Sequence, residues 1–291
     1  MNRTIVFILA VLIVLSSCSV SVRNQDTTPR IATSIYPLQD VTNQIVGEHA
    51  EVFHLIPAGA NPHHFEPPPS IIRQIQDVNL FVGVHPEFDG WIEDLLPEST
   101  PRLYLHPNAA HKDNPGEHNH DFNPHFWLSV RTMRTVLPEL LEALCELDSS
   151  TCPMYIKNFN NYLFTLDSLD REIESQLLPY TNRAFIQWHP AWAGFAKDYG
   201  LRIAGTLEYG HGDALPMRSF NKIIQKAKNE NIRLVVVGLN IESDAANALV
   251  AELDGRLLRL DTIGDPADAD RDTYVELMGR NAQLLARGFE E

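Results

Sequence analysis

The stretch MYIKNFNNYLFTLDSLDREIESQLL, residues 154–178, divides the chain into two halves. Its apolar residues recur at steps of three and four, at Tyr155, Phe159, Tyr162, Leu163, Leu166, Leu169, Ile173 and Leu177. This spacing places them on one face of an α-helix. A helix of about 25 residues would be about 37 Å long, enough to run the height of a two-lobed protein. The segment 153–180 is therefore predicted to be a helix that links two lobes.

On both sides of this helix the sequence alternates between short β-prone runs and amphipathic helical patterns. Before it, strands are predicted at 31–36, 51–56, 80–84 and 103–105, and helices at 38–48, 70–77, 88–95 and 128–146. After it, strands are predicted at 184–187, 201–206, 233–237 and 257–260, and helices at 192–199, 219–230, 243–253 and 274–287. This order is typical of an α/β fold, so we expect an N-terminal lobe at 31–152 and a C-terminal lobe at 181–291, each with a mainly parallel sheet flanked by helices.

The first 17 residues are typical of an export signal. Arg3 precedes an apolar stretch, Ile5 to Leu15, that is too short to span a bilayer. The stretch ends Leu-Ser-Ser-Cys18, which resembles the lipobox of bacterial lipoproteins and predicts lipidation at Cys18; the alternative is an ordinary signal peptide in which Cys18 is incidental. Residues 18–30 are polar and are predicted to be a tether. No later apolar run is long enough to cross a membrane, so we expect attachment through lipid alone.

Charge and cysteine content narrow the class of protein further. The chain has 23 Lys and Arg against 38 Asp and Glu, a net charge of −15, which argues against nucleic acid and anionic lipid as partners. Beyond Cys18 only Cys145 and Cys152 remain. In an exported protein, two cysteines so close in sequence predict a local disulfide across a turn, with a reactive role as the alternative.

Histidines and a carboxylate follow several predicted strands. In parallel α/β lobes the carboxyl ends of the strands face the crevice where ligands bind. The candidates are His63 and His64 after strand 51–56, His125 in NPHFWLS before a helix, His189 after strand 184–187, and Asp272 after strand 257–260 at the start of the last helix. These side chains are predicted to converge between the lobes on one divalent cation.

The same segments carry a family resemblance over essentially the whole mature chain. They are SIYPLQDVTNQI, IPAGANPHHFEPPPSIIRQIQDVNLFVGVHPEFDGWI, NPHFWLS, HPAWAGFAKDYGL, GHGDALPMRSFNKII and DTYVELMGRNAQLLA. In this order and spacing, the chain resembles the metal-binding solute-binding proteins of zinc and manganese ABC importers, the cluster 9 or cluster A-I group. The resemblance implies two lobes joined by one backbone helix, with the metal in the crevice between them.

Carried over position by position, the resemblance implies the metal ligands His63, His125, His189 and Asp272. Two alternatives stay open: His64 in place of His63, and a water in place of Asp272. Asn123 stands where the family usually has Asp before its Pro-His pair. The segment VVVGLNIES stands where relatives often carry a Glu-Pro pair, which puts the local wall of the crevice in doubt.

The ligand types themselves favour zinc. Three imidazoles and one carboxylate suit Zn²⁺ better than Mn²⁺, which prefers oxygen ligands. A histidine-rich loop, 106–120, adds His106, His111, His118 and His120, and in the resembling family such a loop accompanies zinc transport. It is predicted to be an accessory metal-binding loop; the alternative is a solvated loop without metal.

Together these features predict a non-enzymatic, lipid-anchored protein of the cell envelope. It would act as a monomer, bind Zn²⁺ or less readily Mn²⁺, and pass the ion to an ABC permease with its ATPase. A zinc hydrolase is the first rival, but the chain lacks an HExxH helix and a GxSxG elbow. The second rival is a surface adhesin or zinc buffer that does not act in transport.

Overall fold

The computed structural model describes residues 28–62, 65–107, 123–208, 216–239, 241 and 244–290. The signal peptide predicted at 1–17 and most of the tether predicted at 18–30 lie outside these residues, whereas Arg30 already belongs to the first strand. In the described part of the chain, no helix combines the length and apolarity needed to cross a membrane.

Two four-stranded parallel sheets form the two lobes. The first sheet contains β1 (Arg30–Thr33), β2 (Glu51–His54), β3 (Leu80–Gly83) and β4 (Arg102–Tyr104), in the order β2-β1-β3-β4. The second contains β5 (Ala184–Gln187), β6 (Arg202–Thr206), β7 (Leu234–Gly238) and β8 (Arg256–Leu260), in the equivalent order β6-β5-β7-β8. The predicted two-lobed α/β fold is confirmed. In each lobe the strand order reverses beside the lobe's first strand, which is where open parallel sheets place their ligands.

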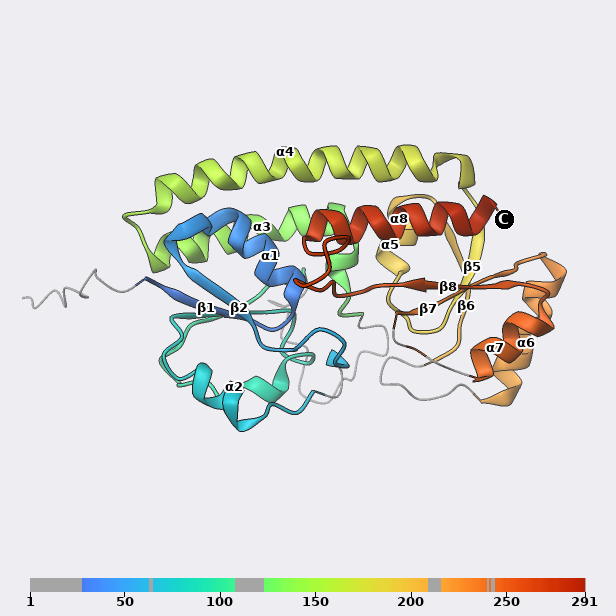
Figure 1. Ribbon diagram of the computed structural model, residues 1–291, viewed down its shortest axis with the longest axis horizontal. Coiled ribbons are helices and arrows are strands. Elements are labelled where there is room, and N and C mark those ends of the chain that lie inside the picture. The colour runs from blue at the N-terminus through green and yellow to red at the C-terminus, as the bar shows by residue number, and fades with distance from the viewer. Residues whose placement is uncertain are drawn as a thin grey trace, which may run out of the picture.

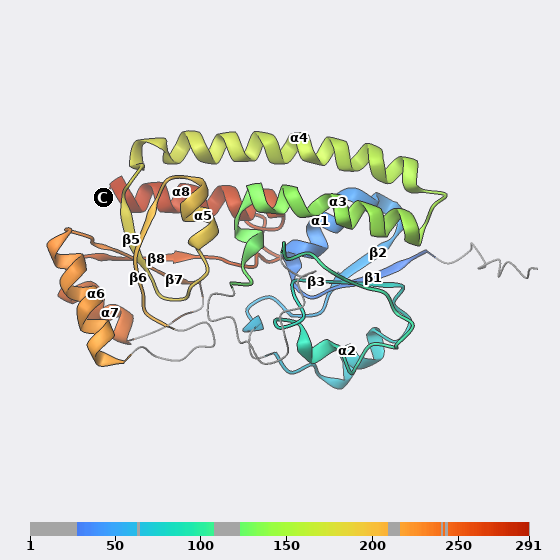
Figure 2. The same ribbon diagram turned by 180° about the vertical axis from the view of Figure 1, so that it is seen from behind.

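Helices cover both faces of each sheet (Figure 1). They are α1 (Tyr36–Val46), α2 (Pro69–Gln74), α3 (Val130–Leu147), α4 (Cys152–Leu177), α5 (Ala193–Asp198), α6 (Met217–Asn229), α7 (Asp244–Glu252) and α8 (Tyr274–Glu290). Helix α4 passes above both sheets, with α1 and α3 beneath it over the first sheet and α8 beneath it over the second, and Figure 2 shows the same arrangement from behind. Helices α2, α6 and α7 lie on the opposite side of the sheets.

The long helix α4 packs on an apolar core that both lobes share. Its 26 residues give a length of about 39 Å. Its buried side chains are Tyr155, Phe159, Tyr162, Leu166, Leu169, Ile173 and Leu177, while Leu163, predicted on the same face, is half-buried. They belong to one apolar cluster that continues from Ile31 in the first sheet to Phe185 in the second. The lobes therefore cannot separate widely without repacking this cluster.

A disulfide closes the turn that leads into α4. Cys145 lies in the last turns of α3, Cys152 is the first residue of α4, and the structure joins their sulfur atoms. The crosslink restricts the unfolded chain around this turn and so stabilises the helical hairpin.

One predicted helix of the first lobe is wrong. Residues 88–95 were expected to be helical, but the structure has only the 3-10 turn Gly90–Ile92. The reason lies in the buried carboxylate of Asp89, which accepts hydrogen bonds from the backbone N–H groups of Val84 and His85, at 2.5 and 3.1 Å. These bonds fold the segment back onto the end of β3 instead of letting it continue as an α-helix.

Asp89 predicts how stability depends on pH. Its side chain is fully buried, and burial raises its pKa to about 7. In the unfolded chain Asp89 has an ordinary Asp pKa of ~3.9. Between these two pKa values the side chain is therefore protonated in the native state but ionised in the unfolded chain. Unfolding then releases a proton between about pH 4 and 7, so this contribution to the free energy of unfolding decreases as pH rises through that window.

We expect urea unfolding to show this loss between pH 5 and pH 8. In the Asp89→Asn variant the side-chain amide cannot ionise but keeps an oxygen for the two N–H groups, so the variant should lose less stability over the same interval. Equal pH dependence in the wild type and the variant would contradict the prediction.

Candidate metal centre

A cavity of about 340 Å³ opens where the two lobes meet. The first lobe contributes residues 59–62, His125 and Trp127 to its wall. The second lobe contributes Trp188, His189, Glu208, residues 236–239, residues 261–264 and Arg271, among others. Two of the histidines predicted as ligands thus line one cavity from opposite lobes.

His125 and His189 point at each other across this cavity. Their Nε2 atoms are 3.1 Å apart, and the two rings are nearly perpendicular. His189 follows β5 by two residues, at the point where the strand order of the second sheet reverses. His125 directly precedes the 3-10 turn Phe126–Leu128 and is 7% exposed. The tertiary fold therefore brings together residues 64 positions apart in the chain.

Asn123 orients the ring of His125. Its Oδ1 atom accepts from the backbone N–H of His125 at 3.0 Å, and its Nδ2 atom donates to the carbonyl of Pro190 at 2.9 Å. Because a backbone N–H can only donate and a carbonyl can only accept, these bonds assign the two ends of the amide. The contact of Oδ1 with His125 Nδ1, at 2.7 Å, therefore has its proton on Nδ1. Asn123 leaves the lone pair of His125 on Nε2 and also ties the two lobes together beside His189.

Glu208 orients the ring of His189 as Asn123 orients that of His125. Its Oε1 atom lies 2.5 Å from His189 Nδ1, and both side chains are mostly buried. An ionised carboxylate accepts, so the proton of the neutral imidazole is on Nδ1 and the lone pair is on Nε2. Glu208 lies two residues beyond β6, the neighbour of β5 in the sheet.

The two Nε2 lone pairs consequently face each other at a distance that suits a shared cation. Tetrahedral zinc with Zn–N bonds of about 2.0–2.1 Å separates two nitrogen ligands by about 3.3–3.4 Å. The 3.1 Å between His125 and His189 is within a few tenths of an ångström of that value. The geometry of this pair is thus compatible with both nitrogens reaching one metal ion.

Asp272, the predicted fourth ligand, is not among the residues that line the cavity. Its backbone carbonyl accepts a hydrogen bond from the hydroxyl of Tyr36, at the start of α8. The carboxylate of this segment that does line the cavity is Asp261, directly after β8. In the described residues no three His, Cys, Asp or Glu side chains form a group able to hold a metal.

The sequence placed His106 in a histidine-rich loop, but in the structure its side chain is buried. It is 9% exposed, its Nε2 atom lies 3.1 Å from the carbonyl of Asn123, and its ring packs edge-on against His85 and Phe126. Burial lowers the pKa of His106, which favours the neutral ring that donates to this carbonyl. His106 therefore supports the backbone of Asn123. The other predicted loop histidines, His111, His118 and His120, lie outside the described residues, as do His63 and His64.

Sequence reasoning missed the roles of three residues around the pair. Asn123 stood out only as a departure from a family pattern, and neither Glu208 nor Asp261 was among the candidate ligands. A usable signal existed for Glu208 and Asp261, because each closely follows a predicted strand, as His189 does.

The zinc-uptake family model described as "ZnuA: Zinc-uptake complex component A periplasmic" matches residues 31–288. The chain belongs to the ZnuA family. The predicted resemblance is thereby confirmed, and the family is one of transport components, not of enzymes.

Individual relatives agree with this assignment. The chain is 26% identical to the zinc-binding protein AdcA of Streptococcus pyogenes over 250 residues, which are 77% of this chain and 48% of AdcA. It thus spans about half the length of these relatives. It is 25% identical to the high-affinity zinc uptake system protein ZnuA of Bacillus subtilis, covering 88% of this chain and 86% of that protein.

Solved structures give the same result for the fold. A crystal structure of ZnuA superposes with a TM-score of 0.77 at 25% identity, over 90% of this chain and 99% of that one. A ZnuA deletion mutant with zinc bound gives the same TM-score at 26% identity, over 90% of this chain and 98% of the other.

Proposed function

We propose that this ZnuA-family protein captures Zn²⁺ outside the cytoplasm and delivers it to an ABC permease and its ATPase. The observation that carries the proposal is the pair of opposed Nε2 atoms of His125 and His189, one from each lobe. Both rings are oriented by hydrogen bonds that their Nδ1–H groups donate to Asn123 and Glu208, which leaves each Nε2 facing the cavity, as in metal-binding imidazoles. Membership of a family of zinc-uptake components supports the same function.

A third imidazole is proposed to come from His63. Residues 59–62, which directly precede His63 in the sequence, line the cavity. His64 is the alternative at this position. Three imidazoles favour Zn²⁺ over Mn²⁺, which prefers oxygen ligands, although Mn²⁺ remains the second candidate ion.

Capture is proposed to occur by completing a coordination shell between the lobes. Because one apolar cluster runs beneath α4 through both lobes, binding should produce a small tilt and local ordering of loops instead of a wide closure. We expect the protein to be a monomer that lipidation at Cys18 holds at the membrane surface, and the name "zinc-binding lipoprotein" of a Streptococcus pneumoniae AdcA suggests a lipid anchor for that relative.

Zinc titrations at two pH values test the histidine ligands. Protons compete with zinc for imidazole nitrogens, and histidine titrates near pH ~6.5, so affinity should fall at least about tenfold from pH 7.5 to pH 5.5. Competition with a chromophoric chelator measures both constants on metal-free protein. Equal affinity at the two pH values would exclude histidine ligation.

The choice between His63 and His64 needs a matched pair of variants. His63→Ala should weaken zinc binding at least about 100-fold, more than the loss expected for a group that only supports a ligand, while His64→Ala should cost less than about tenfold. The reverse order would move the ligand to His64. An unchanged affinity in both variants would remove this segment from the site.

A further inference from the structure

Two carboxylates line the cavity among the residues that the structure describes there, Glu208 and Asp261. Glu208 is engaged with His189 Nδ1, on the side of the ring that faces away from His125. Asp261 is therefore the described carboxylate that could add an oxygen ligand to the two imidazoles. The contacts that hold Asp261 therefore decide whether its carboxylate can bind the ion.

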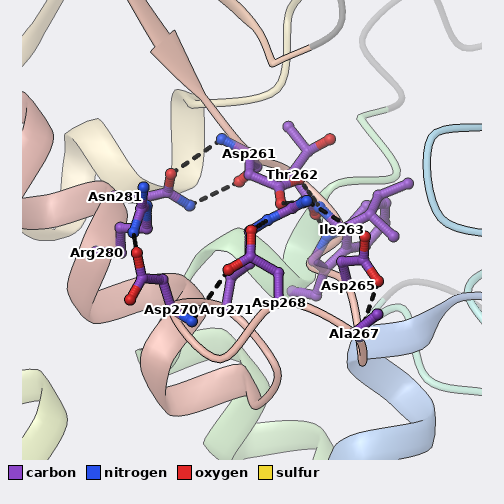
Figure 3. Close-up of polar contacts among 11 residues, drawn as sticks. Asp261, Thr262, Ile263, Asp265, Ala267, Asp268, Asp270, Arg271, Arg280 and Asn281 are labelled. Atoms are coloured by element: carbon purple, nitrogen blue, oxygen red, sulfur yellow. Dashed lines mark hydrogen bonds and ion pairs between the residues drawn. The ribbon is translucent and has the colours of Figure 1, made fainter.

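Both oxygens of Asp261 are already engaged (Figure 3). Oδ1 accepts from the backbone N–H of Ile263 at 3.0 Å, and Oδ2 accepts from Arg271 Nη1 at 2.5 Å. The backbone of Asp261 is anchored as well, because its N–H and carbonyl both bond to the side-chain amide of Asn281, a residue of α8 that is 1% exposed. The carboxylate is thus fixed in position and turned toward Arg271.

Arg271 itself is held by two further carboxylates. Its Nε atom bonds to Asp268 at 2.8 Å and its Nη2 atom to Asp265 at 3.3 Å (Figure 3), and only 17% of its side chain is exposed. A guanidinium binds carboxylates through a rigid planar fork, so three partners around it fix its orientation. To reach a metal ion, Asp261 would have to leave this network.

We propose that Arg271 withholds Asp261 from the bound ion and thereby makes the site selective for Zn²⁺ over Mn²⁺. The inference rests on the proposed function, since it concerns the ion held by His125 and His189. With Asp261 withheld, imidazoles hold the ion and solvent completes its shell. This donor set suits zinc, whereas manganese depends more strongly on carboxylate oxygen. Arg271 is a specificity-determining residue in this account, and it touches no ligand histidine.

The Asp261→Asn variant gives the first test. Zinc affinity, measured by competition with a chromophoric chelator, should stay within about threefold of the wild type, because a withheld carboxylate contributes no bond to the ion. A loss of tenfold or more would make Asp261 a ligand and overturn the proposal.

The Arg271→Gln variant gives the second test. Freed from Arg271, Asp261 can complete the shell, so Mn²⁺ affinity, followed by electron paramagnetic resonance of the free ion, should rise at least about tenfold. The gain should disappear in the double variant Arg271→Gln/Asp261→Asn. Arg280→Gln is the matched control, because Arg280 pairs with Asp270 nearby but does not line the cavity.

The outcomes separate this inference from the proposed function. If the wild type binds zinc and His189→Ala does not, the zinc site of the proposed function is supported. Suppose that Arg271→Gln is then folded by circular dichroism but binds Mn²⁺ no better than the wild type. This result overturns the role of Arg271 alone. If Arg271→Gln does not fold, Arg271→Lys replaces it, because lysine keeps the charge but cannot hold three carboxylates in one fork. The Asp261→Asn result decides the inference in either case.

Discussion

Replacing His189 by alanine is expected to weaken zinc binding at least about 100-fold while the protein stays folded. The variant removes one of the two imidazoles whose Nε2 atoms face each other at 3.1 Å and leaves the other without its partner across the cavity. Groups that only support a ligand typically contribute about 10–100-fold to metal affinity, so the loss of a ligand should exceed that range. Competition titration of metal-free protein at pH 7.5 measures the effect.

Two further variants show whether the loss is specific. His49→Ala removes an exposed histidine of the 3-10 turn Gly47–His49, which follows α1, and should change zinc affinity by less than about twofold, as expected of a surface position. Glu208→Gln removes the charge behind His189 but keeps an acceptor, and an intermediate loss of about tenfold is expected. Affinity of the His189→Ala variant within threefold of the wild type would remove His189 from the site.

Replacing Trp127 by alanine is expected to lower the free energy of unfolding by about 3–5 kcal/mol. Trp127 is 1% exposed and packs in the apolar cluster that both lobes share. Its indole N–H donates to the carbonyl of Thr262 in the second lobe at 2.6 Å, and its own carbonyl accepts from the hydroxyl of Tyr274 at 2.7 Å. The variant therefore leaves a cavity and an unpaired carbonyl at the junction of the lobes, two residues from His125.

Urea unfolding of metal-free protein measures this loss. Trp127→Phe keeps much of the ring but loses the hydrogen bond to Thr262, so it should cost less, about 1–3 kcal/mol. Phe164→Ala is the control: Phe164 lies on α4 and is 71% exposed, so its loss should cost less than about 0.5 kcal/mol. A Trp127→Ala variant as stable as this control would show that the lobes do not depend on Trp127.

Local sequence pattern predicted most elements of the fold because the cause of each element is local. The spacing of Tyr155, Phe159, Tyr162 and Leu166 follows the helical repeat, and the structure buries all four on one face of α4. The strand expected at 184–187 is β5 residue for residue. The pattern was wrong at 88–95, where the hydrogen bonds that Asp89 accepts from the backbone just after β3 override it.

The sequence by itself also predicted the chemistry of the candidate site, since it offered His125 before the segment FWLS and His189 directly after a strand, where parallel sheets present their ligands. Only the tertiary structure decided which acidic side chains accompany them. Asp272 and Asp261 both follow β8, but the ties of Asp261 to Asn281 and Arg271 place it in the cavity wall, while Asp272 lies outside that wall. Likewise Glu208 reaches His189 because β6 and β5 are neighbours in the sheet. Such contacts depend on distances between residues far apart in the chain, which periodicity and spacing do not encode.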